Sequence, residues 1–387
     1  MSTLSLARLL FAITAGTHFL FVSLTLGLAA LVAITQTRAV LRNSDVHLRM
    51  VRFWGQLYVI NYAVGIVTGL LMEFQFGLNW PGLTDHARDV FGAPLAMETL
   101  VAFFIESTFL GLWIFGWDRL NRYAHLALIW VVTLTAYASA YFILVANGFL
   151  TNPVGYLRTG GELRIDNAGK LFTNPTALLP LAHITAGAFL VAGFFMAGVS
   201  GWHLRRSGDP DFFRRSLRTG LISVVVAILP SAMFGLAQFP YRHDGPGSAV
   251  SDAAFTVMML AWVWMFVVSI IALAKLLAGR WLLRGRIFFG VLGWTLVVPY
   301  IAMLAGWVFR EGGRQPWLIY GVLRTEDAVR PMSQGAMFTA VAGITVLFVG
   351  LAVVNVALLR TYARRGPDGS TLGRAQTAEH PEPVPTF

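Results

Sequence analysis

Two glutamates, Glu98 and Glu106, stand inside one long apolar run, FGAPLAMETLVAFFIESTFLGLWIFGW (residues 91–117). At 1.5 Å per residue the run can cross a bilayer of roughly 30 Å. A carboxylate in hydrocarbon costs about 2.5–3.5 kcal/mol even on the membrane-insertion scale that gives the smallest penalty. Two such residues in one span therefore require an explanation other than packing. On a helix, a spacing of eight residues places them nearly on one face, about 12 Å apart in depth. We expect a proton path or a cofactor site; the alternative is a pair of carboxylates that only hydrogen-bond to neighbouring helices.

Histidine and methionine side chains in other apolar runs could hold haem iron. His18 lies in AGTHFLF, and intramembrane histidines usually serve as ligands or proton relays. His183 and the pair Met258 and Met259 are predicted to lie five or six residues from the same membrane surface. An imidazole and a thioether at one depth are the axial pair of many low-spin haems. The simpler interpretations are a buried hydrogen bond for His183 and ordinary packing for the methionine.

Other polar residues in or near the apolar runs give weaker signals. Glu73, in MEFQFG, is equally consistent with anchoring at the membrane interface and with a cofactor contact. His125 and His203 stand at the ends of apolar runs, so we expect them to lie near water.

The composition places these residues in an integral membrane protein. The chain has 387 residues, of which 56% are hydrophobic and 12% charged, so hardly any soluble domain is expected. It has no cysteine, which excludes disulfides, iron–sulfur clusters and covalent haem attachment. The first apolar run, Leu4 to Thr35, is too long for a cleavable signal and is predicted to be a retained span. The net charge of +10 is better explained by membrane topology than by nucleic-acid binding.

Nine apolar segments predict an all-α, polytopic fold, because a helix satisfies its own backbone hydrogen bonds within the bilayer. Strands are not expected. The segments are Leu6–Thr35, Phe53–Leu78, Pro94–Trp117, Ala124–Gly148, Ala177–His203, Leu217–Phe239, Ala253–Leu277, Ile287–Phe309 and Gly335–Leu359.

Lysine and arginine predict the orientation. With the N-terminus outside, the inner segments carry nearly twice as many of these residues as the outer ones, as the positive-inside rule requires. The C-terminus is then cytoplasmic. Residues 1–365 form the membrane domain, and residues 366–387, rich in Pro, Glu, Thr and Gly, are predicted to be a disordered cytoplasmic tail.

Several long blocks of the sequence closely resemble subunit I of the cytochrome bd quinol oxidases, over about residues 4–365. The blocks are THFLFVSLTLG (17–27), GLLMEFQFGLNW (69–80), residues 91–120, ILVANGF (143–149) and GRQPW (313–317). The resemblance implies nine spans in the bacterial cytoplasmic membrane and three non-covalent haems: low-spin b, high-spin b and usually d. It implies reduction of O₂ to water with protons taken from the inside, and a second, subunit II-like membrane subunit; a small single-span subunit is left open.

The resemblance also assigns roles to single residues. His18 falls on the axial ligand of a high-spin haem, and His183 on the low-spin ligand. Its partner is Met258, with Met259 as the alternative if the register slips by one. Glu98 falls at the paired high-spin haems. The proton channel takes Glu106 with the hydroxyl groups of Ser107 and Ser139, and the GRQPW block supplies Arg314 and Trp317 as cofactor contacts.

Four departures from the family pattern bear on cofactors and donor. Leu304 replaces the glutamate that ligates the high-spin b haem, and Tyr300 and Thr256 replace a tryptophan and an arginine. That haem is then absent, five-coordinate through another group, or held by Glu98 or Met303. The connection Pro240–Asp252 is too short for the family's quinol-binding loop. The electron donor (quinol, cytochrome c or another) and the choice of haem b or d at the active site stay open.

We therefore expect a bd-type terminal oxidase subunit I from a branch without the usual quinol site. Within the enzymes, the alternative is reduction of another small ligand such as NO. The loss of the glutamate at position 304 also allows a non-catalytic haem or scaffold subunit beside a competent paralogue. A haem-free transporter is less consistent with the residues, because transporters more often show broken helices at the membrane midplane.

Overall fold

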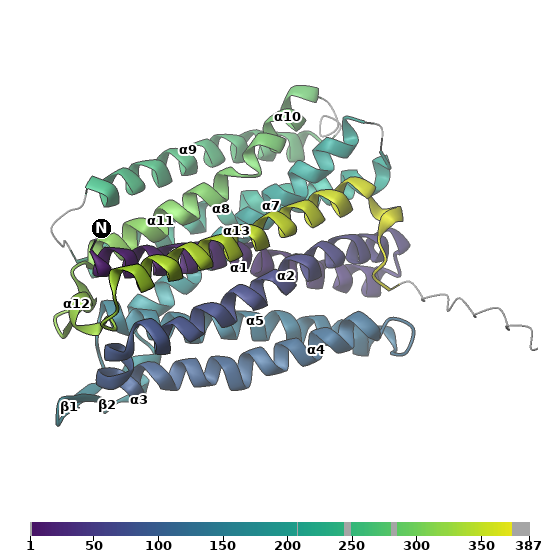
Figure 1. Ribbon diagram of the computed structural model, residues 1–387. Helices are drawn as coiled ribbons and strands as arrows, with labels where there is room; N and C mark the ends of the chain where they lie inside the picture. Colours follow the sequence, from purple (N-terminus) through teal and green to yellow (C-terminus); the bar gives the residue numbers. More distant parts are fainter. Residues whose placement is uncertain (1, 207, 244–248, 280–284, 374–387) are drawn as a thin grey trace, which may run out of the picture.

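A computed structural model of the chain describes residues 2–206, 208–243, 249–279 and 285–373. The long helices form one bundle, with the N-terminus at one end and the last described residues at the other (Figure 1). Nine helical segments among these residues are long and apolar enough to cross a membrane, which confirms the predicted all-α, nine-span fold. Each predicted apolar segment overlaps one of them.

The nine segments are α1 (Thr3–Arg42), α2 (Asp45–Asn79), α3–η1–α4 (Pro81–Met97, Glu98–Phe103, Phe104–Phe115), α5 (Arg122–Thr151), α6–α7 (Ala168–Phe172, Pro175–Leu204), α8–η2 (Pro210–Leu236, Phe239–Tyr241), α9 (Ala249–Ala278), α10–α11 (Arg286–Thr295, Val298–Arg314) and α13 (Gln334–Arg365). Two short helices, α12 (Thr325–Ala328) and η3 (Pro367–Gly369), lie outside them.

Helix ends follow local sequence signals. The side chains of Asn121, Asp209 and Ser333 accept hydrogen bonds from the free N–H groups that begin α5, α8 and α13. Asn43 ends α1 in the left-handed conformation, which asparagine tolerates better than most residues. These caps separate α1 from α2 and α7 from α8 without long connections, so sequential helices pack side by side in antiparallel pairs.

Strands were not expected, yet the two long connections each form a two-stranded antiparallel hairpin. β1 (Tyr156–Thr159) pairs with β2 (Glu162–Ile165) across Gly160 and Gly161, both of which have positive φ. β3 (Trp317–Ile319) pairs with β4 (Leu323–Arg324). The prediction failed here because it considered the membrane spans, and these connections lie beyond the helix ends.

The predicted disordered tail is partly wrong, because residues 366–373 fold back onto α2. The Ser370 hydroxyl donates to the Arg52 carbonyl, the Thr371 N–H donates to the Gln56 side chain, and Leu372 is buried. Backbone and apolar groups that find partners here stay ordered despite a polar composition. The rest of the predicted tail, residues 374–387, lies outside the described residues.

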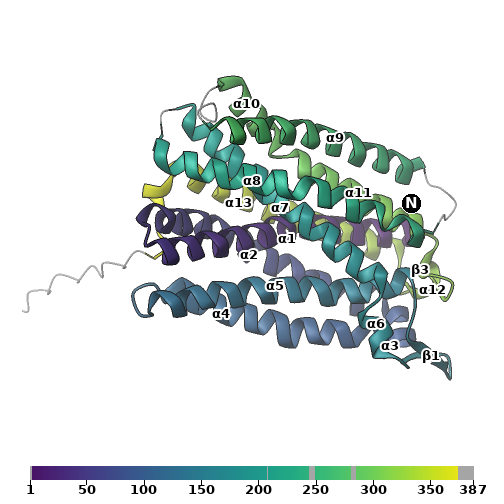
Figure 2. The ribbon, with the colours of Figure 1, turned by 180° about the vertical axis from the view of Figure 1, so that it is seen from behind.

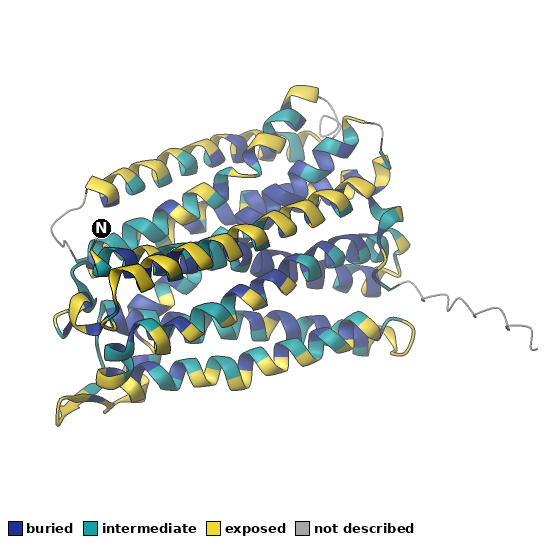
Figure 3. Ribbon diagram, viewed as in Figure 1, coloured by how far each residue is buried: buried dark blue, intermediate teal, exposed yellow. Residues whose placement is uncertain are grey.

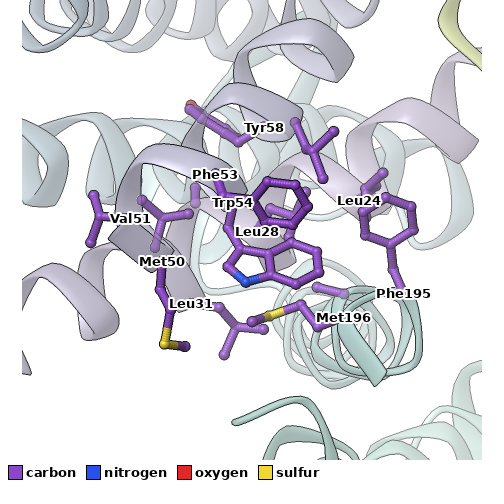
Figure 4. Close-up of a cluster of buried hydrophobic side chains, with 14 of the residues drawn as sticks. Leu24, Leu28, Leu31, Met50, Val51, Phe53, Trp54, Tyr58, Phe195 and Met196 are labelled. Atoms are coloured by element: carbon purple, nitrogen blue, oxygen red, sulfur yellow. The ribbon is translucent and has the colours of Figure 1, made fainter. Parts of the chain in front are cut away.

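The bundle is solid in the half that holds the C-terminal end of α1. There Leu24, Leu28 and Leu31 of α1 pack against Phe53 and Trp54 of α2, with side chains of α7 completing the cluster (Figure 4). Helix α1 is the most buried span, whereas α4, α9 and α13 expose one face along their length (Figure 3). Seen from behind, α7 lies next to α1, and α8 lies next to α7 (Figure 2). The other half of the bundle, which holds the N-terminus, contains the cavity described next.

Candidate functional site

A cavity of about 990 Å³ occupies the half of the bundle nearest the N-terminus. Its walls include residues of α1, α2, α3, η1, α4, α5, α7, α8, α9 and α11, so most spans contribute. The volume is at the upper end of the range for ligand sites. The sequence-predicted residues that line it are His18, Glu98, Glu106, Ser139, His183, Met258 and Arg314. One cavity therefore brings together both predicted iron-binding sets and both glutamates.

His18 points into the cavity with its Nδ1 held by α2. Nδ1 lies 3.0 Å from the hydroxyl oxygen of Thr68. That hydroxyl has one proton, and it lies 3.1 and 3.0 Å from the carbonyl oxygens of Val64 and Gly65, which can only accept. The imidazole is therefore the donor to Thr68. Its Nε2 keeps a free lone pair, the state of a histidine that ligates a metal.

His183 has the same arrangement on α7. Its Nδ1 lies 2.8 Å from the carbonyl oxygen of Ser231 on α8, and a carbonyl only accepts, so Nδ1 carries the proton. Nε2 is again free for a metal. A backbone carbonyl in this role fixes the ring in one orientation and one tautomer.

Glycines on neighbouring helices make room for these side chains. A Cβ at Gly69 would lie 3.0 Å from Cε1 of His18, and one at Gly235 would lie 3.1 Å from Cε1 of His183. A Cβ at Gly306 would lie 2.9 Å from the sulfur of Met258. Sequence reasoning could not single out these glycines, because their role depends on which helix faces them.

Met258 is better placed than Met259 to act as the second ligand. Both methionines of α9 line the cavity, but Met258 packs against Gly306 of α11, whereas the side chain of Met259 is 38% exposed. Neighbouring residues on a helix point about 100° apart, so the two thioether groups face different directions.

Glu98 belongs to a hydrogen-bonded cluster of carboxyl and hydroxyl groups. It accepts from Ser139 of α5 at 2.5 Å and from Thr99 at 3.2 Å, and the Thr99 hydroxyl also lies 3.0 Å from the carboxylate of Glu73. Glu73 lines the cavity, which favours a site contact over interface anchoring. Glu106 is only 5% exposed and lies on the same cavity.

A π-helical turn explains why Glu98 and Glu106 share one wall. The sequence spacing predicted one face, but in a regular α-helix eight residues turn the side chain by about 800°, which leaves the two about 80° apart. The segment η1, which begins at Glu98, is π-helical, and the Phe104 N–H bonds to the carbonyl of Thr99, five residues back. A π turn holds one more residue than an α turn, so the pair faces like residues seven apart, within about 20°.

Two predicted site residues do not reach the cavity. Ser107 bonds to the Phe104 carbonyl of its own helix, because it follows Glu106 by one residue and points about 100° away. Trp317 lies in β3, where the guanidinium of Arg324 covers its ring. Trp307 lines the cavity instead. Leu304 contacts α1 at Gly16 and does not line the cavity, whereas Met303, like Glu98, does.

The histidines predicted near water are buried in structural networks. His125 hydrogen-bonds Gln36 through Nδ1 and the Trp113 carbonyl through Nε2, so neither ring nitrogen is left for a metal. His203 bonds to the carbonyl of Ala363, and its ring stacks on a phenylalanine. The prediction was wrong because residues of other helices, Trp113 of α4 and Ala363 of α13, pack against these helix ends and bury the imidazoles.

Arginines gather at the N-terminal end of the cavity. Arg314 is buried and paired with Glu311, Arg310 donates to the Thr176 carbonyl, and the buried Nε of Arg8 has no hydrogen-bond partner among the described residues. All three line the cavity. Arg8 and Arg310 were not predicted, although an arginine within or next to an apolar segment is a usable signal.

This donor set fits haem. Two imidazoles with free Nε2 atoms and a thioether are typical axial ligands, and guanidinium groups suit the carboxylates of a tetrapyrrole. The described residues contain no group of three or more His, Cys, Asp or Glu placed to hold a bare metal ion. Iron would therefore need a macrocycle to complete its coordination.

Comparison with known proteins places the chain in a family. The family model for cytochrome bd terminal oxidase subunit I matches residues 6–240 and 231–367. The chain is 31% identical to the cytochrome bd ubiquinol oxidase subunit 1 of Bacillus subtilis (strain 168), over 95% of each chain. It is 28% identical to the cytochrome bd-II ubiquinol oxidase subunit 1 of Escherichia coli (strain K12), over 94% of this chain and 97% of the relative.

The fold agrees with that placement. The structure of bd oxidase from Geobacillus thermodenitrificans matches with a TM-score of 0.85 and 25% sequence identity, covering 94% of this chain and 99% of that one. Nine membrane spans, a haem-compatible cavity and matches over nearly the whole chain lead to the same conclusion. The chain belongs to the cytochrome bd terminal oxidase subunit I family, haem-containing oxygen reductases of the bacterial inner membrane.

Proposed function

We propose that this chain reduces O₂ to water with haem held by His183 and Met258 at one site and by His18 at another. The observation that carries the proposal is the shared orientation of the two histidines, each donating from Nδ1 and leaving Nε2 on one cavity. Bound haem would supply the iron that binds O₂ and passes it four electrons. The residues of the chain hold the cofactor, exclude bulk water and deliver the protons.

Arginine and tryptophan would complete the cofactor site. Arg314, buried and fixed by Glu311, and Arg310 are placed to pair with carboxylate groups of the cofactor. Trp307 offers a flat apolar wall. With Leu304 at the usual glutamate position, a further haem could be served by Glu98 or Met303, which both line the cavity.

Glu106 and Glu98 would deliver the protons. Each reduction of O₂ to two water molecules consumes four protons, and these must cross a cavity wall that is otherwise mainly apolar. Glu106 accepts a proton from the inner side and releases it toward Glu98, which Ser139 and Thr99 hold in one orientation. A carboxyl group can do this because it is stable in both protonation states. With the N-terminus outside, this direction matches proton uptake from the cytoplasm.

The names of the relatives raise the question of the donor, because two of them are ubiquinol oxidases. The alignment with the Escherichia coli relative runs over 503 residues, more than the 387 of this chain, so that relative carries segments absent here. The family model also matches in two pieces that meet at residues 231–240, where α8 ends. We infer that no folded quinol loop stands between α8 and α9, and that the donor binds elsewhere. Residues 244–248 of this connection lie outside the described residues.

The haem assignment is tested by the reduced-minus-oxidised spectrum of the purified complex, with its partner subunit present. His183→Ala should abolish the low-spin signal and keep a high-spin one. His203→Ala is a matched control, because it removes a buried histidine of the same helix whose Nε2 bonds to a backbone carbonyl. The control should keep every haem signal. An unchanged spectrum for His183→Ala would refute the assignment of His183 as a ligand of the low-spin haem.

The same spectrum, together with measured O₂ and NO consumption, separates the alternatives. A wild-type complex that carries haem but consumes no O₂ would favour a non-catalytic subunit, and consumption of NO in place of O₂ would favour that ligand. A complex without haem would leave only a transporter-like role.

A further inference from the structure

Two buried tyrosine hydroxyl groups next to Glu106 have no hydrogen-bond partner among the described residues. They belong to Tyr58 and Tyr62 of α2, whose side chains are 0% and 8% exposed. Buried polar groups in proteins are almost always hydrogen-bonded to protein or to ordered water. Two such groups one helical turn apart therefore point to a specific occupant.

The hydroxyl groups lie on the approach to Glu106. The two tyrosine rings are 5.8 Å apart, and both hydroxyls are close enough to the Glu106 carboxyl group to interact with it electrostatically. Tyr62 lines the cavity with Glu106, whereas Tyr58 lies one turn nearer the start of α2, outside the cavity lining. With the predicted orientation, α2 begins at the inner side. The three side chains thus form a series from the solid half of the bundle to the cavity.

A neighbouring polar residue shows what a purely structural role looks like here. Asn61, also on α2, donates to the Phe21 carbonyl at 2.8 Å and to the Thr25 hydroxyl at 2.9 Å, and its oxygen accepts from Asn355. Its amide group is satisfied by protein atoms alone. The tyrosines on the adjacent part of the helix are not, so their hydroxyls are built for a different partner.

We propose that Tyr58 and Tyr62 hold a short file of water molecules against Glu106, and that protons reach this carboxyl group along it. The proposal rests on the function proposed above. Buried waters typically bridge polar groups that would otherwise be unsatisfied, and a hydroxyl can donate to one water and accept from the next. Each proton that enters the file displaces one at its far end. The waters and tyrosines stay neutral, and the Glu106 carboxylate gains the proton. The tyrosines are positioning residues, since they order the water.

The test uses the purified complex with Tyr58→Phe, Tyr62→Phe and the double variant. Tyr141→Phe is the matched control, because it removes a tyrosine hydroxyl that bonds to the Phe172 carbonyl and does not line the cavity. We expect each file variant to slow O₂ consumption per haem about fivefold, equivalent to about 1 kcal/mol, with haem spectra unchanged. The solvent isotope effect on turnover should rise in the file variants and not in the control.

Infrared difference spectroscopy gives a readout that packing alone would not move. The carboxyl band of Glu106, assigned by its loss in Glu106→Gln, should shift in the tyrosine variants because its hydrogen-bonded water changes. An unmoved band with unchanged turnover overturns the proposal. A double variant that is more thermostable and fully active also overturns the proposal, because that result means that the two hydroxyl groups are buried without bound water. If Glu106→Gln itself keeps full turnover, the proton path proposed above is wrong. If Glu106→Gln loses turnover but the tyrosine variants change neither turnover nor the Glu106 band, only the present inference is wrong.

Discussion

Replacing Glu106 by Gln tests the proton path with little structural disturbance. The side chain is 5% exposed on the cavity wall, and in the described part of the chain its carboxyl group makes no hydrogen bond that the substitution would break. Glutamine has nearly the same volume and can still bond to water. We therefore expect the free energy of unfolding to change by less than about 1 kcal/mol, with normal haem content.

The expected loss of turnover is large because the proposed path has no other carboxyl group that could pass protons to Glu98. Glu106 and Glu98 are separated by the π turn η1 and the start of α4, and the equivalent of seven α-helical steps of 1.5 Å places them about 10 Å apart along the helix. Direct proton transfer needs heavy atoms within about 3 Å, so the amide would leave only water to span this distance. Acid–base groups of this kind typically contribute a factor of about 10²–10⁴. We expect O₂ consumption per haem to fall at least about 100-fold, or about 2.7 kcal/mol.

The assay is O₂ consumption by the purified complex, normalised to haem from the reduced-minus-oxidised spectrum. Glu326→Gln is a suitable control, since it neutralises an exposed carboxylate paired with Arg324 on the hairpin connection. A Glu106→Gln complex whose turnover per haem stays within about twofold of the wild type would refute the relay. Activity that falls only in proportion to haem content would mean that Glu106 serves packing.

Four further outcomes follow from the structure. Gly235→Ala should shift the low-spin haem signal, because the added Cβ would lie 3.1 Å from His183; an unmoved signal would contradict the contact. Met258→Leu should abolish that signal and Met259→Leu should keep it, and the reverse would show the slipped register. Leu372→Ala should lower stability by about 2 kcal/mol in a thermal melt with turnover per haem unchanged, since the residue is buried in the same hydrophobic cluster as Phe53 and Trp54. Quinone analogues should not bind at the connection between α8 and α9; fast quinol oxidation blocked by an inhibitor seated there would overturn this.

The sequence alone was enough for the spans, and most of the site residues that it predicted line the cavity. Hydrocarbon thickness imposes a minimum apolar length, so nine segments could be recognised without knowing their neighbours, and the family and fold class are confirmed. A polar residue deep in such a segment is costly unless it faces a site, and His18, His183 and Glu106 all do line the cavity. Their roles as ligands and relay stay predictions.

Only the tertiary structure decided how the helices turn and which faces meet. The π turn at Glu98 brings two glutamates to one wall, whereas regular helical spacing would place them about 80° apart. The same rotation directs Ser107 away from the site, and the fold of a connection removes Trp317 from it. The free Nε2 of His183 depends on a carbonyl from another helix, 48 residues along the chain. Such contacts are set by packing between distant segments, and no local pattern of residue types records them.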